Sequence, residues 1–175
     1  PNKKPNILFI AVEGLSQPDL FAGHTPFLDK FSEENISYKN FVNHQRVTTN
    51  GLYSIWCGDY PNIGSTDTKS EALQDHKLLP KCLPQFLKDN GYNTYYLQSS
   101  VIDYMEKDKL AKAAGIDIIM GANELPYINE RNAWGADDKS LFISTKTIIK
   151  EALKRDKPYF MTLLNIGTHH PFPNT

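Results

Sequence analysis

The chain has 175 residues, of which 40% are hydrophobic and 22% are charged, an ordinary composition for one globular domain. Its 19 basic and 20 acidic residues are scattered along the sequence and give a formal net charge of −1. No basic face is therefore available for the phosphate backbone of a nucleic acid, which argues against such a partner.

The apolar segments are too short to cross a bilayer. None approaches the roughly 20 residues that a spanning helix needs. The opening PNKKPNILFI also lacks the order of charged, apolar and small residues that is typical of a signal peptide. The chain as given is therefore expected to be soluble.

The first part of the chain predicts two strands and two helices. Residues 6–13, NILFIAVE, form a nearly continuous apolar run that suits a strand buried on both faces. Residues 25–35 begin with a Thr cap and a Pro at the first helical position, which predicts a helix. Residues 36–43 alternate like a strand, and a second helix is predicted to start at Thr48 or Thr49.

The second part alternates more regularly, after a polar stretch over residues 59–79 that is typical of an excursion over the surface. Apolar periodicity, proline near helix starts and glycine at helix ends mark its segments. In chain order, we predict a helix over 83–90, a strand over 92–98, a helix over 103–114, a strand over 116–120, a helix over 138–155 and a strand over 158–165.

This alternation predicts an α/β fold with a mostly parallel sheet and helices on both faces. Ligands bind such sheets at the carboxyl ends of the strands. That rule places Glu13, the loop before Thr48, residues 98–100 and residues 165–170 on one rim.

The paired threonines at the start of the second helix allow two interpretations. Thr and Asn are good N-caps, and Asn50 follows the pair directly. A hydroxyl at a helix N-terminus also lies where an anion is favoured, so Thr48 or Thr49 could instead act as a nucleophile towards a phosphate.

Three other positions could carry chemistry, although each has an ordinary structural role. Glu13 could be a solvated strand end or a ligand of a hard divalent cation. His169 lies in a polar loop after the last strand. Trp134 precedes a turn in which Asp137 or Asp138 could cap the next helix.

The two cysteines, Cys57 and Cys82, form no Cys-x-x-Cys motif, so a zinc knuckle or a thioredoxin-type site is not indicated. Two free buried thiols and one disulfide remain open from the residues alone.

The order and spacing of these motifs make them more specific than any one of them. PNILFIAVEG, TPFLDKFSEENISYKNF, TTNGLYSIWCG, GYNTYYLQ, WGADD and NIGTHHPF follow one another along essentially the whole chain. In this respect the sequence resembles the alkaline-phosphatase and sulfatase superfamily. The resemblance is to the branch of lipoteichoic acid synthases, phosphoglycerol transferases and phosphoethanolamine transferases.

The resemblance implies roles for four residues. Glu13 matches the strand-end carboxylate that binds the metal. Thr48 matches the threonine nucleophile, which also contacts the metal, and the register to Cys57-Gly58 selects it over Thr49. Trp134 matches a Trp-Gly element near the substrate head group, and His169 matches the His-x-Pro-Phe histidine that contacts the phosphoryl group or leaving oxygen.

Sulfatases that use formylglycine are disfavoured, because residues 48–52 lack the Cys/Ser-x-Pro-x-Arg context of that modification. Family members also take two further metal ligands, an Asp-His pair, from a later strand, and this chain ends at Thr175. We therefore expect residues 1–175 to be the amino-terminal part of one catalytic domain, inactive as a fragment.

The function implied is metal-dependent transfer of a phosphoglycerol-type head group from a phospholipid donor to a glycan or lipid acceptor, through a phosphothreonine intermediate. The cofactor implied is a divalent ion, Mn, Mg or Zn. The parent is expected to be membrane-anchored and to act outside the cytoplasm, on the outer face of the cytoplasmic membrane or in the periplasm. The alternatives are a phosphate or sulfate ester hydrolase and a catalytically silent domain that binds an anionic glycan.

An extracytoplasmic location favours a disulfide between Cys57 and Cys82. These cysteines flank the polar stretch over 59–79, which a cross-link would pin.

Overall fold

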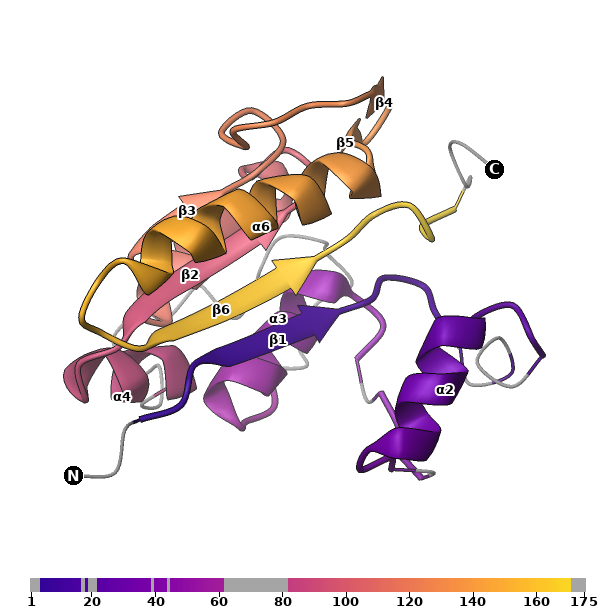
Figure 1. Cartoon of the computed structure of the whole chain (residues 1–175), viewed down its shortest axis with the longest axis horizontal. Helices are drawn as coiled ribbons and strands as arrows, with labels where there is room; N and C mark the ends of the chain where they lie inside the picture. Colours follow the sequence, from indigo (N-terminus) through magenta and orange to yellow (C-terminus); the bar gives the residue numbers. More distant parts are fainter. Residues whose placement is uncertain are drawn as a thin grey trace.

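The computed structural model describes residues 4–16, 18, 22–38, 40–43, 45–61 and 82–170. Its centre is a four-stranded sheet in the order β1-β6-β2-β3, and every neighbouring pair of strands is parallel (Figure 1). The strands are β1 (Ile7–Ala11), β2 (Asn93–Gln98), β3 (Ile118–Met120) and β6 (Tyr159–Leu164). The α/β fold with a mostly parallel sheet, expected from the alternation of segments, is confirmed.

Helices cover both faces of this sheet. In Figure 1, α6 lies over one face, and α3 and α4 lie on the other. The helices are α2 (Pro26–Glu34), α3 (Thr48–Cys57), α4 (Leu83–Asp89), the 3-10 turn η2 (Tyr104–Glu106), α5 (Lys107–Ala113) and α6 (Asp138–Leu153). A small antiparallel pair, β4 (Arg131–Asn132) and β5 (Gly135–Ala136), was too short to be read from the sequence pattern. In the part of the chain that is described, no helix is long and apolar enough to cross a membrane.

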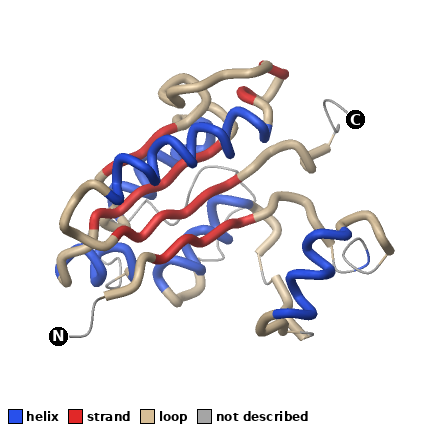
Figure 2. The backbone as a smooth tube through the Cα atoms, in the orientation of Figure 1, coloured by secondary structure: helices blue, strands red, loops and turns tan. Residues whose placement is uncertain are grey.

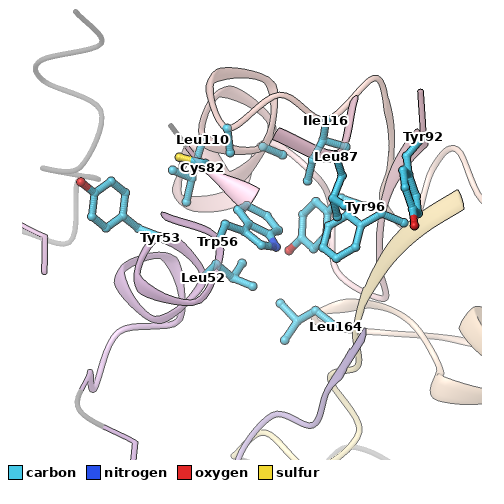
Figure 3. Close-up of a cluster of buried hydrophobic side chains, with 13 residues drawn as sticks. Leu52, Tyr53, Trp56, Cys82, Leu87, Tyr92, Tyr96, Leu110, Ile116 and Leu164 are labelled. Carbon is cyan, nitrogen blue, oxygen red and sulfur yellow. The ribbon is translucent and has the colours of Figure 1, made fainter. Parts of the chain in front are cut away.

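The alternating side chains of the central strands divide the core into two clusters. On one face, Trp56 of α3 packs edge-on against Tyr96 of β2, with ring centroids 5.1 Å apart (Figure 3). The Trp56 indole also donates a hydrogen bond to Thr162 Oγ1 of β6, at 3.1 Å. On the other face, α6 packs against residues of β2 and β6, with Leu141, Tyr95, Leu97, Met161 and Leu163 buried in one cluster. Both faces of the inner strands are therefore buried, as continuous apolar runs indicate. The prediction that the strand within residues 6–13 is also buried on both faces is wrong. In the described chain β1 is an edge strand, and Leu8 and Ile10 on one of its faces are 42% and 45% exposed.

The strand order sets the position of the site. The last strand, β6, lies between the first strand, β1, and β2, with Ala11 opposite Leu164 and Gln98 opposite the same residue. The last strand is thus inserted between two strands that precede it in the sequence, and the carboxyl ends of these parallel strands lie at one edge of the sheet, where such sheets bind ligands. The residues that follow β1 and β6 consequently meet there.

Two predicted segments are wrong. No strand forms over the described residues in 36–43, where Ile36 and Tyr38 are largely exposed. Alternation favours an amphipathic strand, but it supplies no partner strand for the hydrogen bonds. The helix predicted over 103–114 is broken into η2 and α5, because Met105 and Glu106 adopt left-handed backbone conformations with φ of 57° and 54°.

The segment around α2 also differs from expectation at its cap. The Thr25 hydroxyl donates to Asp29 Oδ1 at 3.2 Å and makes no side-chain bond to the backbone of the first turn. Figure 2 shows α2 set off from the sheet, and none of its residues is buried. Of the polar stretch predicted over 59–79, all but the first three residues lie outside the described residues.

A disulfide joins Cys57, the last residue of α3, to Cys82, the N-cap residue of α4, with an S–S distance of 2.10 Å. The choice between two free thiols and one disulfide is thereby decided in favour of the disulfide. Since the two cysteines are 25 positions apart, the bond closes a loop that includes the polar stretch.

We predict that replacing both cysteines, Cys57→Ser and Cys82→Ser, lowers the free energy of unfolding by about 3 kcal/mol, because the open chain gains loop entropy in the unfolded state. Denaturant unfolding of the full-length protein measures this change. Wild-type protein treated with a reductant is the matched control and should lose a similar amount. Recovery of the two cysteines as separately alkylated peptides from oxidised protein would contradict the disulfide.

Candidate active site

Glu13 and Thr48 meet at the carboxyl end of β1. Glu13 lies two residues beyond the strand, and Thr48 is the first residue of α3. The Thr48 hydroxyl donates to Glu13 Oε2 at 3.1 Å. The N-cap position belongs to Val47, and no side chain caps this helix. The capping role considered for the threonines is therefore wrong, and Thr48 directs its hydroxyl to a carboxylate instead.

Thr49 has a different environment from its neighbour. It is 0% exposed, and its Oγ1 has no hydrogen-bond partner among the described residues. A helix turns by about 100° per residue, so adjacent side chains point in different directions. Of the two threonines, Thr48 is the one whose hydroxyl contacts a candidate metal ligand.

The loop that follows β6 holds the backbone of Glu13 on both sides. The Glu13 amide donates to Asn165 Oδ1 at 2.7 Å, and the Thr168 hydroxyl donates to the Glu13 carbonyl. The next residue, Gly14, has a φ of 67°, and a Cβ there would lie 2.5 Å from the Thr168 carbonyl oxygen. Only glycine fits where these two segments of the chain approach each other so closely.

Trp134 and His169 form a second pair. Their ring centroids lie 4.4 Å apart, and the Tyr104 ring lies 6.0 Å from that of Trp134 on an edge-to-face contact. Trp134 is carried by the turn between β4 and β5, where Asn132 Oδ1 accepts from the Trp134 and Gly135 amides at 2.8 and 3.2 Å. The four predicted site residues are thus brought together as two pairs, and the loop over residues 165–170 carries His169 and also contacts Glu13.

Sequence reasoning missed Lys107. This lysine is only 3% exposed, its Nζ donates to the Tyr104 carbonyl at 3.2 Å, and Nζ lies 4.8 Å from the centre of the Tyr104 ring. Burial lowers the pKa of Lys107 to about 8, although the negative charge of Glu13 acts in the opposite direction. In the sequence, EKDKLAK is typical of a solvated helix face, so nothing in the pattern marks this lysine.

The side chains at Glu13 and Thr48 fit part of a divalent cation site. A carboxylate and a hydroxyl oxygen are hard donors, which suit Mg²⁺, Mn²⁺ or Zn²⁺. No group of three His, Cys, Asp or Glu side chains that could hold a metal occurs among the described residues. A complete site would therefore require ligands in addition to these two.

The family model described as Sulfatase matches residues 5–175. The chain belongs to the sulfatase family. Among curated relatives, phosphoglycerol transferase I of Salmonella typhimurium is 29% identical over 186 residues, which cover 98% of this chain and 24% of the relative. The chain thus spans about a quarter of the length of the curated relatives that it matches.

Solved structures share the fold at low identity. A protein of the alkaline phosphatase superfamily from Vibrio parahaemolyticus has a TM-score of 0.84 at 18% identity, covering 99% of this chain and 43% of that one. The lipoteichoic acid synthase LtaP from Listeria monocytogenes has a TM-score of 0.81 at 19% identity, covering 96% and 42%. The C-terminal periplasmic domain of EptC from Escherichia coli, in complex with Zn, has a TM-score of 0.61 at 16% identity, covering 97% and 45%. These likenesses show a shared fold. The match to the family model confirms the resemblance to the sulfatase superfamily.

We predict that Lys107→Met stabilises the full-length protein more at pH 7 than at pH 10. With a pKa of about 8 in the folded chain and 10.5 as its ordinary value, Lys107 binds more protons in the unfolded state between these two pH values. Its contribution to the free energy of unfolding therefore rises with pH across that window. Denaturant unfolding at several pH values measures the difference, and the exposed Lys112→Met on the same helix is the control. Equal pH slopes for the two variants would contradict the prediction.

Proposed function

We propose that the parent protein transfers a phosphoglycerol-type head group from a phospholipid to a glycan or lipid acceptor through a phosphothreonine intermediate. The observation that carries this proposal is the 3.1 Å contact between the Thr48 hydroxyl and Glu13 Oε2 at the carboxyl edge of the sheet. The Salmonella relative, whose name is phosphoglycerol transferase I, supports the choice of head group.

Thr48 would be the nucleophile. Its place at the first position of α3 puts the hydroxyl beside the free amide groups and the positive dipole end of the helix, which favour a phosphate. The hydrogen bond to Glu13 orients the hydroxyl and gives its proton an acceptor. A divalent ion held by Glu13 and Thr48 would lower the pKa of that hydroxyl.

The transfer would take two displacement steps. In the first, a bond forms between Thr48 Oγ1 and phosphorus, and the bond from phosphorus to the diacylglycerol oxygen breaks. His169, whose ring makes a tilted contact with the Trp134 ring, is the candidate donor of a proton to that leaving oxygen. In the second, an acceptor hydroxyl gives up its proton and forms a new bond to phosphorus, while the bond from phosphorus to Thr48 Oγ1 breaks and Thr48 Oγ1 takes up a proton.

The whole protein would be larger than this chain and would act outside the cytoplasm. The solved neighbours are more than twice as long as the part that this chain matches, and one neighbour is a periplasmic domain. We propose that residues 1–175 are the amino-terminal part of the catalytic domain, that the parent is anchored in the membrane, and that an Asp-His pair elsewhere in the parent completes the metal site. The fragment alone would then be inactive.

Thr48→Ala should abolish the covalent adduct, because the methyl group cannot attack phosphorus. Intact-mass analysis of the full-length variant incubated with donor lipid should show no added phospho-head group, and turnover should fall on the order of 10³-fold or more. Thr49→Ala is the matched control and should retain the adduct. An undiminished adduct in Thr48→Ala would overturn the assignment.

Glu13→Gln should weaken metal binding while the fold survives, since the amide keeps the shape of the side chain and removes its charge. Loss of an outer-sphere partner typically costs 10- to 100-fold in metal affinity, so loss of a ligand should cost at least about 100-fold. Calorimetric titration of the full-length protein with Mn²⁺ measures this change. The exposed Glu151→Gln is the control, and equal affinities in the two variants would rule out Glu13 as a ligand.

A further inference from the structure

We propose that Asp138 and Asn165 are positioning residues, which hold the backbone of Glu13 and thereby the carboxylate that the Thr48 hydroxyl contacts. Neither residue needs to touch the substrate for this role. The inference rests on the proposed function for its catalytic consequence, whereas its structural part can be tested separately.

Asp138 is the centre of a hydrogen-bond network at the start of α6. Its Oδ1 accepts from the backbone amides of Ile166 and Gly167 at 3.0 and 2.9 Å, and the Ser99 hydroxyl reaches the same oxygen at 3.4 Å. Its Oδ2 accepts from Asn165 Nδ2 at 2.8 Å. One carboxylate therefore fixes three consecutive residues of the loop after β6.

The Asn165 side chain links Asp138 to Glu13, the residue two positions after β1. Asn165 is 5% exposed, and its side chain offers both a hydrogen-bond donor, Nδ2, and an acceptor, Oδ1. While Nδ2 donates to Asp138, Oδ1 accepts from the Glu13 amide at 2.7 Å. The orientation of the Asn165 amide is thus set by the negative charge of Asp138, because only an acceptor can face the Nδ2 group.

The packing around Asp138 leaves this loop little freedom. A Cβ built at Gly167 would lie 2.5 Å from Asp138 Oδ2, so the carboxylate rests directly against the backbone of the loop. A residue with a side chain at position 167 would push the loop away from Asp138. The contact therefore depends on glycine at one side and on a carboxylate at the other.

The neighbouring Asp137 has a different role and provides a matched control. Its carboxylate caps α6 by accepting from the Ser140 amide at 3.1 Å, and it also accepts from Asn129 Nδ2 at 2.9 Å. Both aspartates lie at the start of the same helix, yet only Asp138 contacts the loop that holds Glu13. Substitution of Asp137 should reduce stability without releasing Glu13.

The order of donors and acceptors allows a swap experiment. In Asp138→Asn, a new NH₂ group faces Asn165 Nδ2. The Asn165 amide is then expected to turn, because turning the new amide instead would leave both the Ile166 and the Gly167 amide facing an NH₂ group. The Glu13 amide thereby loses its acceptor. In Asn165→Asp, two carboxylates face each other. The double variant Asp138→Asn/Asn165→Asp restores a donor facing an acceptor and keeps an oxygen for the Glu13 amide.

The test compares hydrogen exchange at the Glu13 amide in the full-length, metal-free protein with adduct formation by the same variants. Each single variant should exchange about tenfold faster at Glu13, the effect expected for one lost hydrogen bond. In Asp138→Asn the bond is lost because the Asn165 amide turns, and in Asn165→Asp it is lost because the two facing carboxylates repel each other and displace residue 165. The single variants should also form the Thr48 adduct more slowly, with KM for the donor lipid unchanged. The swap should restore both towards wild type, and Asp137→Asn should leave both unchanged after correction for its melting temperature.

Wild-type exchange at Glu13 in both single variants, or a swap that behaves like the single variants, would overturn the positioning role. If the wild-type protein forms no adduct while the exchange pattern follows the swap, the proposed function fails and the positioning of Glu13 by Asp138 and Asn165 stands. The two failures are therefore distinguishable.

Discussion

The candidate site depends on the hydrogen bonds by which the loop after β6 holds the backbone of Glu13 in place. Parallel pairing in register brings the ends of β1 and β6 to the same edge of the sheet. The Asn165 side chain then accepts a hydrogen bond from the Glu13 amide, and the Thr168 hydroxyl donates one to the Glu13 carbonyl. Because both backbone groups are used, the direction of the Glu13 side chain is limited, and the Thr48 hydroxyl can meet it at a defined distance.

Groups of opposite charge lie close together around this point. Glu13 is negative, while the buried Lys107 and the start of α3 contribute positive charge nearby. Lys107 follows directly after Met105 and Glu106, which have left-handed conformations that non-glycine residues seldom adopt. Such conformations persist where the surrounding structure imposes them, and they concentrate at functional sites.

Much of the architecture was predictable because it depends on local periodicity. The apolar runs that became β1, β2 and β6 and the amphipathic segment that became α6 were identified with errors of at most two residues at their ends. The wrong predictions concern segments whose structure depends on contacts with distant parts of the chain. Residues 36–43 alternate as a strand does but have no partner strand in the described chain. The helix break at Met105 and Glu106 occurs without a glycine, so the sequence does not indicate it.

The sequence by itself determined the α/β class and the rim on which the candidate site residues lie, since these follow from periodicity. It also offered the disulfide as one of two options and indicated the family through its resemblance to known motifs. Only the tertiary structure decided that Thr48 faces Glu13 while Thr49 is buried, that Lys107 turns inward, and that Asp138 reaches the Glu13 amide through Asn165. The physical reason is that hydrogen-bond partners separated by 27 to 152 positions are chosen by strand order and packing, which no local pattern contains.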